Sequence, residues 1–364
     1  MKILYCIHAL IEMGGTERML TLKANALCEN YGYEVCIVTS AQNGKELCFP
    51  LSPKIKHIDI GIDFYRHHLR KSFAAALEKV LCEEKPDICL TLAEDVMLML
   101  PQMKDGSIKM MEYHFSYQRY FMEKKGLWGS LRAWNKNRKL RRGAARMNCF
   151  IVLTQADKGA WGLPNIRQIP NPAHLPAKGR HANIFGNDFM AVGRLEAEKN
   201  FSELLYIWKE VSLIHPEKRL HIYGEGRERS ALEKLIQQLG LQEKVFLQGR
   251  TRHIDEKMAE SCALLMTSRY EGFPLALVES LPFGLPLISY NCPNGPAEII
   301  KDGENGFLVP LGDRKEFVRR IRQLIEEDGW KEKMQQAALL QAEKYTLPRI
   351  MEAWDQLFKS TIKH

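Results

Sequence analysis

Short apolar runs recur along the chain and alternate with longer segments whose apolar positions follow the helical period. Short runs rich in Ile, Val, Leu and Cys are typical of strands that are buried on both faces. In the first half we expect strands at 2–10, 34–39, 56–60, 87–92, 108–113 and 149–154, and helices at 14–27, 69–82 and 128–140. This order predicts βαβ units in a doubly wound parallel sheet, where ligands bind at the carboxyl ends of the strands.

The same alternation starts again after a proline-rich tract. Residues 164–176 hold four prolines, and polar residues continue to Asn187, which predicts a domain boundary. Further strands are expected at 188–192, 219–223, 245–248, 263–267 and 286–290. We therefore predict an α/β protein with two Rossmann-like, doubly wound domains, residues 1–170 and 171–345.

Composition is that of an ordinary globular protein and limits the classes of function. With 364 residues, 45% hydrophobic and 26% charged, the chain is long enough for two cores. Its net charge of +8 favours anionic partners such as nucleotide phosphates or acidic membrane. The nine cysteines form no Cys-x-x-Cys pair, which indicates a reducing compartment. There is no run of 18 apolar residues and no basic leader, so we expect a cytoplasmic protein.

The stretch from Glu271 to Glu279, Glu-Gly-Phe-Pro-Leu-Ala-Leu-Val-Glu, predicts the start of a helix. Gly272 permits an unusual turn, Pro274 suits a first helical turn, and apolar residues follow from Leu275. The amides at a helix N-terminus attract phosphate, whereas carboxylates accept hydrogen bonds from sugar hydroxyls. The stretch therefore suggests a nucleotide-sugar site. The alternative is an ordinary amphipathic helix whose two glutamates are solvated.

A second motif, Gly193-Arg194-Leu-Glu-Ala-Glu-Lys199-Asn200, lies between a predicted strand and a predicted helix. Gly193 turns the chain, so that Arg194 and Lys199 can converge on one anion. A guanidinium fork and a compact ammonium together suit a diphosphate. The alternative is a solvated loop with two surface cations.

Together these motifs resemble those of retaining glycosyltransferases with the GT-B fold, of the group 1 or family 4 type. The resemblance covers nearly the whole chain, is strongest over 188–310 and is weakest over 56–146. It implies two facing Rossmann-like domains with an inter-domain cleft, and a C-terminal helix, residues 346–364, that crosses back to the first domain. It also implies that Arg194 and Lys199 neutralise the donor diphosphate.

The resemblance assigns roles to further residues. Gly14 and Gly15 belong to a Gly-Gly-x-Glu loop that would face the donor phosphates. His114 would orient the sugar or the acceptor, and His8 is a second candidate for that role. The implied catalytic residues are Arg194, Lys199, Glu271 and His114, and the implied donor-binding residues are Gly14, Gly15, Arg194, Lys199, Gly224, Gly249, Arg250, Gly272, Phe273, Pro274, Leu275 and Glu279. Glu271 is assigned to the donor sugar and Glu279 to the ribose hydroxyls. The alternative for Gly14 and Gly15 is that they only make a turn. The alternative for His114 is a buried core histidine whose hydrogen bonds are satisfied.

The chain contains no Asp-x-Asp, a common metal-binding signature. Protein cations and a helix end would then stabilise the leaving diphosphate, so we expect no metal ion and no cofactor. Retention and a UDP-sugar donor follow from the resemblance, the donor from the loop 291–300. We expect a saccharide or lipid-linked acceptor, in cell-surface polysaccharide or glycolipid synthesis. The alternatives are another GT-B enzyme, such as a sugar-nucleotide epimerase or a phosphorylase, and a catalytically silent partner subunit.

Residues 124–146 hold nine basic residues and no acidic one. Helical spacing gives this segment two faces. The basic face comprises Arg132, Lys136, Lys139 and Arg142, with Trp128 beside it. The apolar face comprises Leu127, Leu131 and Trp134. A basic amphipathic helix with tryptophan is typical of binding to anionic membrane. The alternative is a solvated helix whose apolar side packs on the first domain. Nucleic acid is not an expected partner, because interleaved stacking aromatics are lacking.

Overall fold

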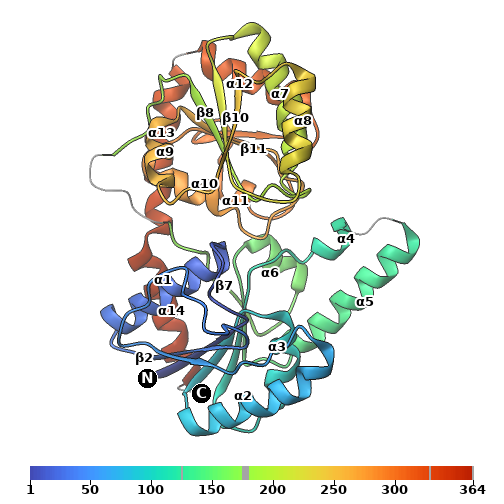
Figure 1. Ribbon diagram of the computed structural model, residues 1–364. Coiled ribbons are helices and arrows are strands. Elements are labelled where there is room, and N and C mark those ends of the chain that lie inside the picture. The colour runs from blue at the N-terminus through green and yellow to red at the C-terminus, as the bar shows by residue number, and fades with distance from the viewer. Residues whose placement is uncertain (124–125, 174–179, 328, 363–364) are drawn as a thin grey trace. The chain divides into compact units, whose positions relative to one another are not determined.

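The computed structural model describes residues 1–123, 126–173, 180–327 and 329–362. It divides into two compact units, one formed by Met1–Asn171 with Pro348–His364 and the other by Pro172–Leu347. Each unit contains one parallel β-sheet with helices packed on it (Figure 1). The prediction of two α/β domains with doubly wound parallel sheets is confirmed.

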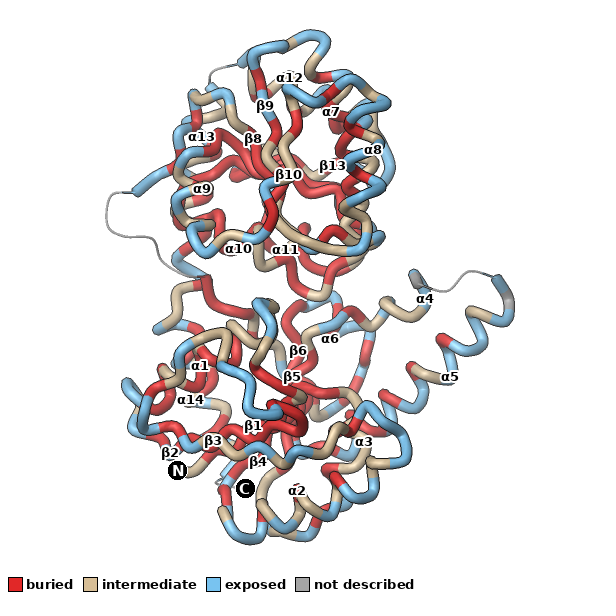
Figure 2. The backbone as a smooth tube through the Cα atoms, in the orientation of Figure 1, coloured by how far each residue is buried: buried red, intermediate tan, exposed pale blue. Residues whose placement is uncertain are grey.

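The first unit is built on a seven-stranded sheet in the order β3-β2-β1-β4-β5-β6-β7. Its strands are β1 (Lys2–Ile7), β2 (Glu34–Thr39), β3 (Lys56–Asp59), β4 (Ile88–Thr91), β5 (Ile108–Tyr113), β6 (Cys149–Val152) and β7 (Ile166–Gln168). Every neighbouring pair is parallel, with β1 at the centre between β2 and β4. The central strands are buried on both faces, which is why they are continuous apolar runs (Figure 2).

Helices cover both faces of this first sheet. They are α1 (Gly15–Asn30), α2 (Arg70–Glu84), α3 (Glu94–Met99), α4 (Arg119–Glu123), α5 (Leu127–Ala144), α6 (Gln155–Trp161) and α14 (Leu347–Ile362). One core lies under α2, α3, α5 and α6, where Phe73, Phe150 and Trp161 are buried together. On the other face, Lys23 of α1 lies 5.0 Å from the ring centroid of Trp354 in α14.

The second unit is built on a six-stranded parallel sheet in the order β10-β9-β8-β11-β12-β13. Its strands are β8 (Asp188–Val192), β9 (Arg219–Tyr223), β10 (Val245–Gly249), β11 (Ala263–Met266), β12 (Leu287–Tyr290) and β13 (Gly306–Val309). Its helices are α7 (Phe201–Ile214), α8 (Arg229–Leu239), α9 (Ile254–Glu260), α10 (Leu275–Ser280), α11 (Pro296–Ile299), α12 (Arg314–Glu326) and α13 (Gly329–Ala342).

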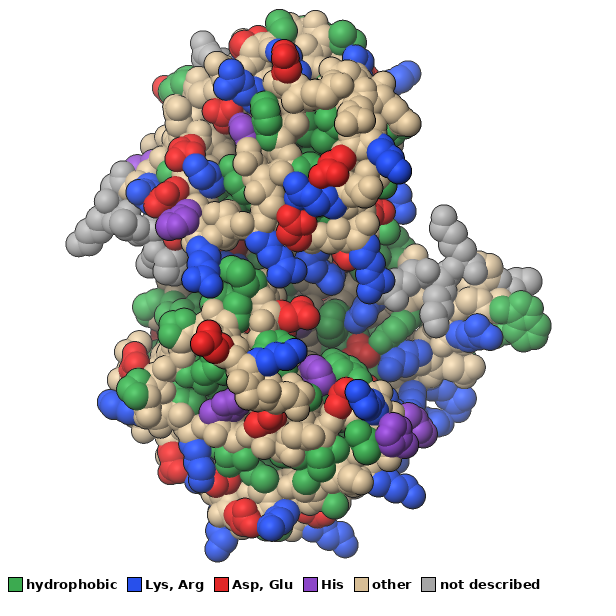
Figure 3. Space-filling view, in the orientation of Figure 1, with side chains coloured by type: hydrophobic (Ala, Val, Ile, Leu, Met, Phe, Trp, Pro, Cys, Tyr) green, Lys and Arg blue, Asp and Glu red, His purple; other side chains and the backbone are tan. Residues whose placement is uncertain are grey.

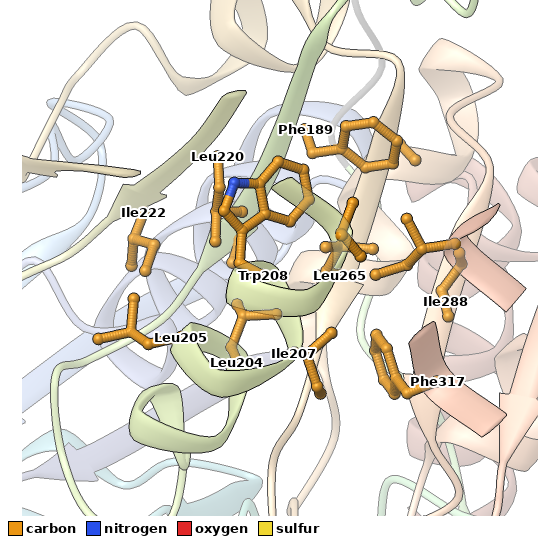
Figure 4. Packing of buried hydrophobic residues seen from close by; sticks show 14 of the residues in the cluster. Phe189, Leu204, Leu205, Ile207, Trp208, Leu220, Ile222, Leu265, Ile288 and Phe317 are labelled. Carbon is orange, nitrogen blue, oxygen red and sulfur yellow. The ribbon is translucent and has the colours of Figure 1, made fainter. Parts of the chain in front are cut away.

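One face of this second sheet packs against α7, α8 and α12. Trp208 of α7 is fully buried, and its ring centroid lies 5.2 Å from that of Phe189 in β8 (Figure 4). Ile288 of β12 and Phe317 of α12 complete the same cluster. This packing fixes the strands whose carboxyl ends carry the second-unit motifs.

Most expected elements have counterparts in the structure, and a few differ. Strands β2, β5, β8 and β9 have the predicted ends, whereas the first strand stops at Ile7 instead of residue 10. The proline-rich tract 164–176 was predicted as a boundary only, but it also contains β7. Its Ile-Arg-Gln sequence has one buried residue, as is usual for an edge strand, so the apolar pattern is too weak to show it. The helices α3, α4 and α6 were not expected.

Candidate donor site at the edge of the second sheet

Three loops at the carboxyl edge of the second sheet pack against each other through glycine backbone. Gly193 follows β8, Gly224 follows β9, and Gly249 ends β10. The Gly224 amide donates to the Gly249 carbonyl at 2.8 Å, and the Gly193 amide donates to the Tyr223 carbonyl at 3.0 Å. Gly224 has φ +146°, and a Cβ there would lie 1.8 Å from the Gly193 carbonyl oxygen. Only glycine therefore fits at Gly224, which gives a physical reason for the glycines in the sequence motifs.

Lys199 stands beside this glycine backbone and is held by Glu271. Its aliphatic stem lies over Gly193, where an added Cβ would be 3.2 Å from both Cδ and Cε of the lysine. The Lys199 ammonium donates to both carboxylate oxygens of Glu271, at 2.7 and 2.9 Å. The two side chains are only 19% and 8% exposed. An ammonium has three donors, so one N–H of Lys199 is left for a further acceptor.

Two contacts fasten the loop of Lys199 to the loop of Glu271. Thr267, directly after β11, donates its hydroxyl to the carbonyls of Lys199 and Asn200, at 3.3 and 3.2 Å. The Arg269 guanidinium donates to Asn200 Oδ1 at 3.0 Å. Asn200 has φ +55°, in the left-handed region that asparagine tolerates better than most residues. The ammonium is thus positioned by side chain and backbone together.

Arg194 is exposed and is not bonded to the same carboxylate. Its guanidinium donates to Glu198 Oε1 at 2.7 Å, within its own loop. The structure therefore brings Lys199 together with Glu271, and it pairs Arg194 with Glu198. Because Arg194 is an exposed side chain with one surface ion pair, little free energy holds it in this position. Its convergence with Lys199 on one anion stays a prediction.

The stretch 271–279 differs from expectation in its helix, and the roles of its two carboxylates stay predictions. Helix α10 has six residues, and Pro274 is its N-cap instead of lying in the first turn. The Leu275 amide already donates to the Phe273 carbonyl at 2.8 Å, so a short helix with an occupied amide is a weaker seat for phosphate than predicted. Glu271 and Glu279 are both buried, which excludes the alternative of two solvated glutamates.

The remaining predicted donor-binding residues of the second unit lie around this edge. Phe273 is buried, with its ring centroid 6.2 Å from that of Tyr345, and Gly272 precedes it. Arg250 follows Gly249 and is exposed. Gly295, after β12, has φ +107°, and a Cβ there would lie 2.2 Å from Pro274 Cδ. The loop after β12 thus packs on the start of α10.

The first-unit candidates lie at the carboxyl ends of β1 and β5. Gly14 is the N-cap of α1 and Gly15 its first residue, and a Cβ on Gly14 would lie 2.1 Å from Glu17 Oε2. His8 Nδ1 lies 2.9 Å from Ser40 Oγ, and burial lowers the pKa of this histidine. These positions agree with a ligand edge, but their roles stay predictions.

His114 belongs to a buried charge cluster that sequence reasoning missed. Lys23 of α1 and Glu112 of β5 are fully buried and form an ion pair through Glu112 Oε1. His114 Nε2 lies 3.0 Å from the same oxygen, and its side chain is buried. Burial opposes ionisation of Glu112, but the Lys23 charge and His114 outweigh it and hold the pKa of this carboxyl at about 2. The available signal was a charged residue at a position of the buried pattern in each element, Lys23 in α1 and Glu112 in β5.

The described residues contain neither a cluster of metal ligands nor a membrane-spanning helix. In the ranges described, no three His, Cys, Asp or Glu side chains come together as a metal site. No helix in the described part of the chain is both long and apolar enough to cross a bilayer.

Comparison with known proteins agrees with the fold and the motifs. Residues 185–341 match the family described as "Glycosyl transferases group 1". An uncharacterized glycosyltransferase of Haemophilus influenzae is 26% identical over 97% of this chain and 98% of its own. The Campylobacter jejuni GalNAc-alpha-(1->4)-GalNAc-alpha-(1->3)-diNAcBac-PP-undecaprenol alpha-1,4-N-acetyl-D-galactosaminyltransferase is 26% identical over 98% of both chains.

Two solved structures share the fold over almost their whole length. A mutant of S. aureus TarM in complex with fondaparinux, α-GlcNAc-glycerol and UDP has a TM-score of 0.81, with 16% identity over 98% of this chain and 99% of that one. Anabaena Alr3699/HepE in complex with UDP and glucose has a TM-score of 0.79, with 16% identity over 99% and 100%. The match to the group 1 glycosyltransferases thus covers most of the second unit, and the chain as a whole has the GT-B fold.

Proposed function

We propose that this glycosyltransferase transfers a hexosyl or N-acetylhexosaminyl group from a UDP-sugar, with retention and without a metal ion or cofactor. The acceptor is a hydroxyl of a saccharide or of a lipid-linked saccharide, in the synthesis of cell-surface polysaccharide or glycolipid. We place the reaction at the cytoplasmic face of a membrane, which agrees with nine cysteines that are all free. The observation that carries the proposal is Lys199, held by Glu271 over the glycine backbone after β8.

The Lys199 ammonium suits a donor diphosphate for three reasons. It is positioned before a ligand arrives, so little side-chain entropy is lost on binding. It keeps one N–H for a phosphate oxygen after satisfying Glu271. Gly193 adds no side chain of its own beside the ammonium, so the lysine stem packs directly on its backbone. Arg194, exposed in the same loop, can turn from Glu198 to a second phosphate oxygen.

In the proposed reaction, the bond between the sugar C1 and the diphosphate oxygen breaks as the acceptor oxygen bonds to C1. The electron pair leaves with UDP, where Lys199 and Arg194 stabilise the developing negative charge. The acceptor proton passes to the departing phosphate, so no carboxylate nucleophile is required. Attack occurs on the face from which UDP leaves, and configuration at C1 is retained.

The choice of donor and acceptor draws on the relatives. UDP is present in the TarM and Alr3699/HepE complexes, and the TarM complex also contains an α-GlcNAc glycoside. The common UDP-hexoses and UDP-N-acetylhexosamines are α-linked, so an α-product from such a donor means retention. The C. jejuni relative is described by an undecaprenyl-diphosphate-linked saccharide acceptor. These observations support a UDP-sugar and a saccharide acceptor on a lipid carrier.

A donor screen with EDTA present tests the proposal. UDP-, GDP- and ADP-sugars are compared by thermal shift, because a ligand that binds only the folded protein raises its apparent stability. We expect UDP-sugars to raise the melting temperature of wild type and of the control Lys234→Ala, an exposed lysine on α8, but not of Lys199→Ala. The anomeric configuration of the product is then determined by NMR. An inverted product, or activity that EDTA removes and Mn²⁺ restores, would overturn the proposal.

A further inference from the structure

Two charged side chains lie in the interior of the first unit and have no part in the reaction as proposed. Many charged side chains of this unit are exposed, and Figure 3 shows Lys, Arg, Asp and Glu spread over the face in view. Lys23 of α1 and Glu112 of β5 are instead only 1% exposed each and form an ion pair. A buried pair of this kind is no more stable than well-packed apolar side chains of similar size. Stability alone therefore gives no reason for the pair.

Three elements surround the Glu112 carboxylate. The Lys23 ammonium of α1 donates to Oε1 and lies 5.0 Å from the ring centroid of Trp354 in α14, so it is fixed between a carboxylate and an aromatic face. Tyr5 of β1 is also close, because burial and the Glu112 charge together raise the pKa of its phenol. With a pKa of about 2, Glu112 is ionised at neutral pH. The site therefore holds a permanent negative charge in a fixed position.

This carboxylate faces one nitrogen of a histidine at the ligand-binding edge of the sheet. His114 directly follows β5 and is two positions from Glu112, so both side chains lie on the same face of the sheet. Its Nε2 is buried and lies 3.0 Å from Glu112 Oε1. The other ring nitrogen, Nδ1, reaches the surface and bonds to no described residue. His114 thus connects the buried pair to the carboxyl edge, where doubly wound sheets bind their ligands.

The carboxylate decides which ring nitrogen carries the proton. A lone pair on Nε2 would face the negative charge of Glu112 at 3.0 Å, whereas an N–H at that position is attracted to it. The N–H is not aligned closely enough for a full hydrogen bond, so the attraction is mainly electrostatic. In a neutral imidazole one nitrogen is a donor and the other an acceptor. With the proton on Nε2, the accessible Nδ1 of His114 is an acceptor.

We propose that Glu112, held by Lys23, is a positioning residue that fixes the ring of His114 with Nδ1 as the acceptor for a hydroxyl of the sugar substrate. The inference rests on the proposed sugar transfer, which brings sugar hydroxyls to the protein. A ring with its proton on Nδ1 could only donate at that position. Without the carboxylate both tautomers are populated, and a fraction of the molecules presents the wrong nitrogen. Glu112 does not touch the substrate and acts through His114.

Nitrogen NMR of the histidine rings tests the tautomer without any substrate. The full chain is prepared with isotopically labelled histidine, and the His114 signals are identified by their absence in His114→Gln. At mildly alkaline pH we expect wild type to carry the proton on Nε2 and none on Nδ1. Lys23→Met with Glu112→Leu removes both charges and should show exchanging tautomers. A proton on Nδ1 in wild type, or an unchanged tautomer in this double variant, would overturn the proposal.

A second buried pair on the same strand provides a matched control. Lys109 and Asp105 pair at the opposite end of β5, with side chains 7% and 0% exposed. Lys109→Met with Asp105→Asn removes one charge of each sign and leaves the surroundings of His114 unchanged. This control should keep the wild-type tautomer and turnover. If it alters either as much as the Lys23 and Glu112 substitutions do, general destabilisation explains the effect and positioning is disproved.

Kinetics test whether Glu112 acts through His114. Turnover is followed as UDP release from UDP-glucose or UDP-N-acetylglucosamine, whichever raises the melting temperature of wild type more. His114→Gln should lower turnover about tenfold, since one hydrogen bond is lost, and Lys23→Met with Glu112→Leu should lower it similarly without changing the affinity for UDP. All three substitutions together should cause no further loss, because they remove the same hydrogen bond.

The combined variant gives the decisive outcome. Losses that multiply to about a hundredfold would mean that Glu112 does not act through His114, and an equal loss of UDP affinity would mean general damage. Either result overturns the proposal. The NMR measurement needs no sugar, so it stands by itself if no UDP-sugar is turned over. Failure of the positioning and failure of the proposed reaction are therefore distinguishable.

Discussion

Replacing Lys23 by methionine should destabilise the first unit, because it leaves a buried carboxylate without its cation. Lys23 and Glu112 are fully buried on facing elements, α1 and β5, and His114 is the other group at the carboxylate. Methionine keeps most of the volume of the lysine stem, so the loss of charge dominates over any cavity. Breaking a buried pair by removing one partner typically costs about 3–5 kcal/mol.

The pKa of Glu112 gives a second measure of the same interaction. Its folded-state pKa is about 2, below the 4.5 of the unfolded chain. Between those values the unfolded state binds more protons, so stability rises with pH across this window and is lost as pH falls through it. The difference corresponds to about 3 kcal/mol that is fully present above pH 4.5. In Lys23→Met this acid-side dependence should disappear.

Hydrogen exchange is the appropriate assay, because individual peptides report on the first unit separately from the second. Peptides that cover β5 should exchange about a hundredfold faster in Lys23→Met at neutral pH, as expected for a loss of about 3 kcal/mol. The double variant Lys23→Met with Glu112→Leu removes both charges and should recover most of the protection, because an apolar pair is at least as stable as a buried ion pair. A single variant within about 1 kcal/mol of wild type, or a double variant no better than the single one, would refute this reasoning.

Three further predictions concern the donor edge of the second unit. Lys199→Ala should weaken UDP binding by about 1.5–3 kcal/mol, measured by calorimetry, and near-normal affinity would contradict the assignment. Glu271→Gln should retain UDP binding but lower turnover of the UDP-sugar, while loss of UDP affinity equal to that of Lys199→Ala would show that its main role is to hold Lys199. Gly224→Ala should lose UDP binding and stability together, because the new Cβ collides with the Gly193 carbonyl; an unchanged melting temperature would disprove the close backbone packing.

The strands of both sheets could be predicted from the sequence, whereas the contacts between residues far apart in the chain could not. Buried parallel strands such as β5 are continuous apolar runs, and such runs can be recognised without knowing what surrounds them. Short elements like α3 span too few residues to show a period, which is why they were missed. The glycine at 224 was singled out by its position after a strand, but the carbonyl that excludes a side chain there belongs to another loop.

In the candidate site, too, the sequence predicts the important side chains but not the contacts between them. Lys199 and Glu271 are both identified, yet they lie 72 positions apart, so no local pattern indicates that they bond to each other. Lys23 and Glu112 lie 89 positions apart, and their pairing was not expected at all. On α5 helical spacing alone did not show which face is packed. The structure places Ala133 and Leu140 there and leaves Leu131 exposed, because the contacts with α3 and α4 decide the rotation of the helix.

Helix α14 has a consequence for how the protein is made. The second unit is one continuous segment, Pro172–Leu347, so a ribosome releases all of it before the residues of α14 emerge. The first unit begins earlier in the chain but needs α14, because Trp354 lies over Lys23 and Asp355 accepts a hydrogen bond from Tyr33. During translation Lys23 and Glu112 therefore lack their contact with α14 while the second unit folds. The domain synthesised first is the one completed last.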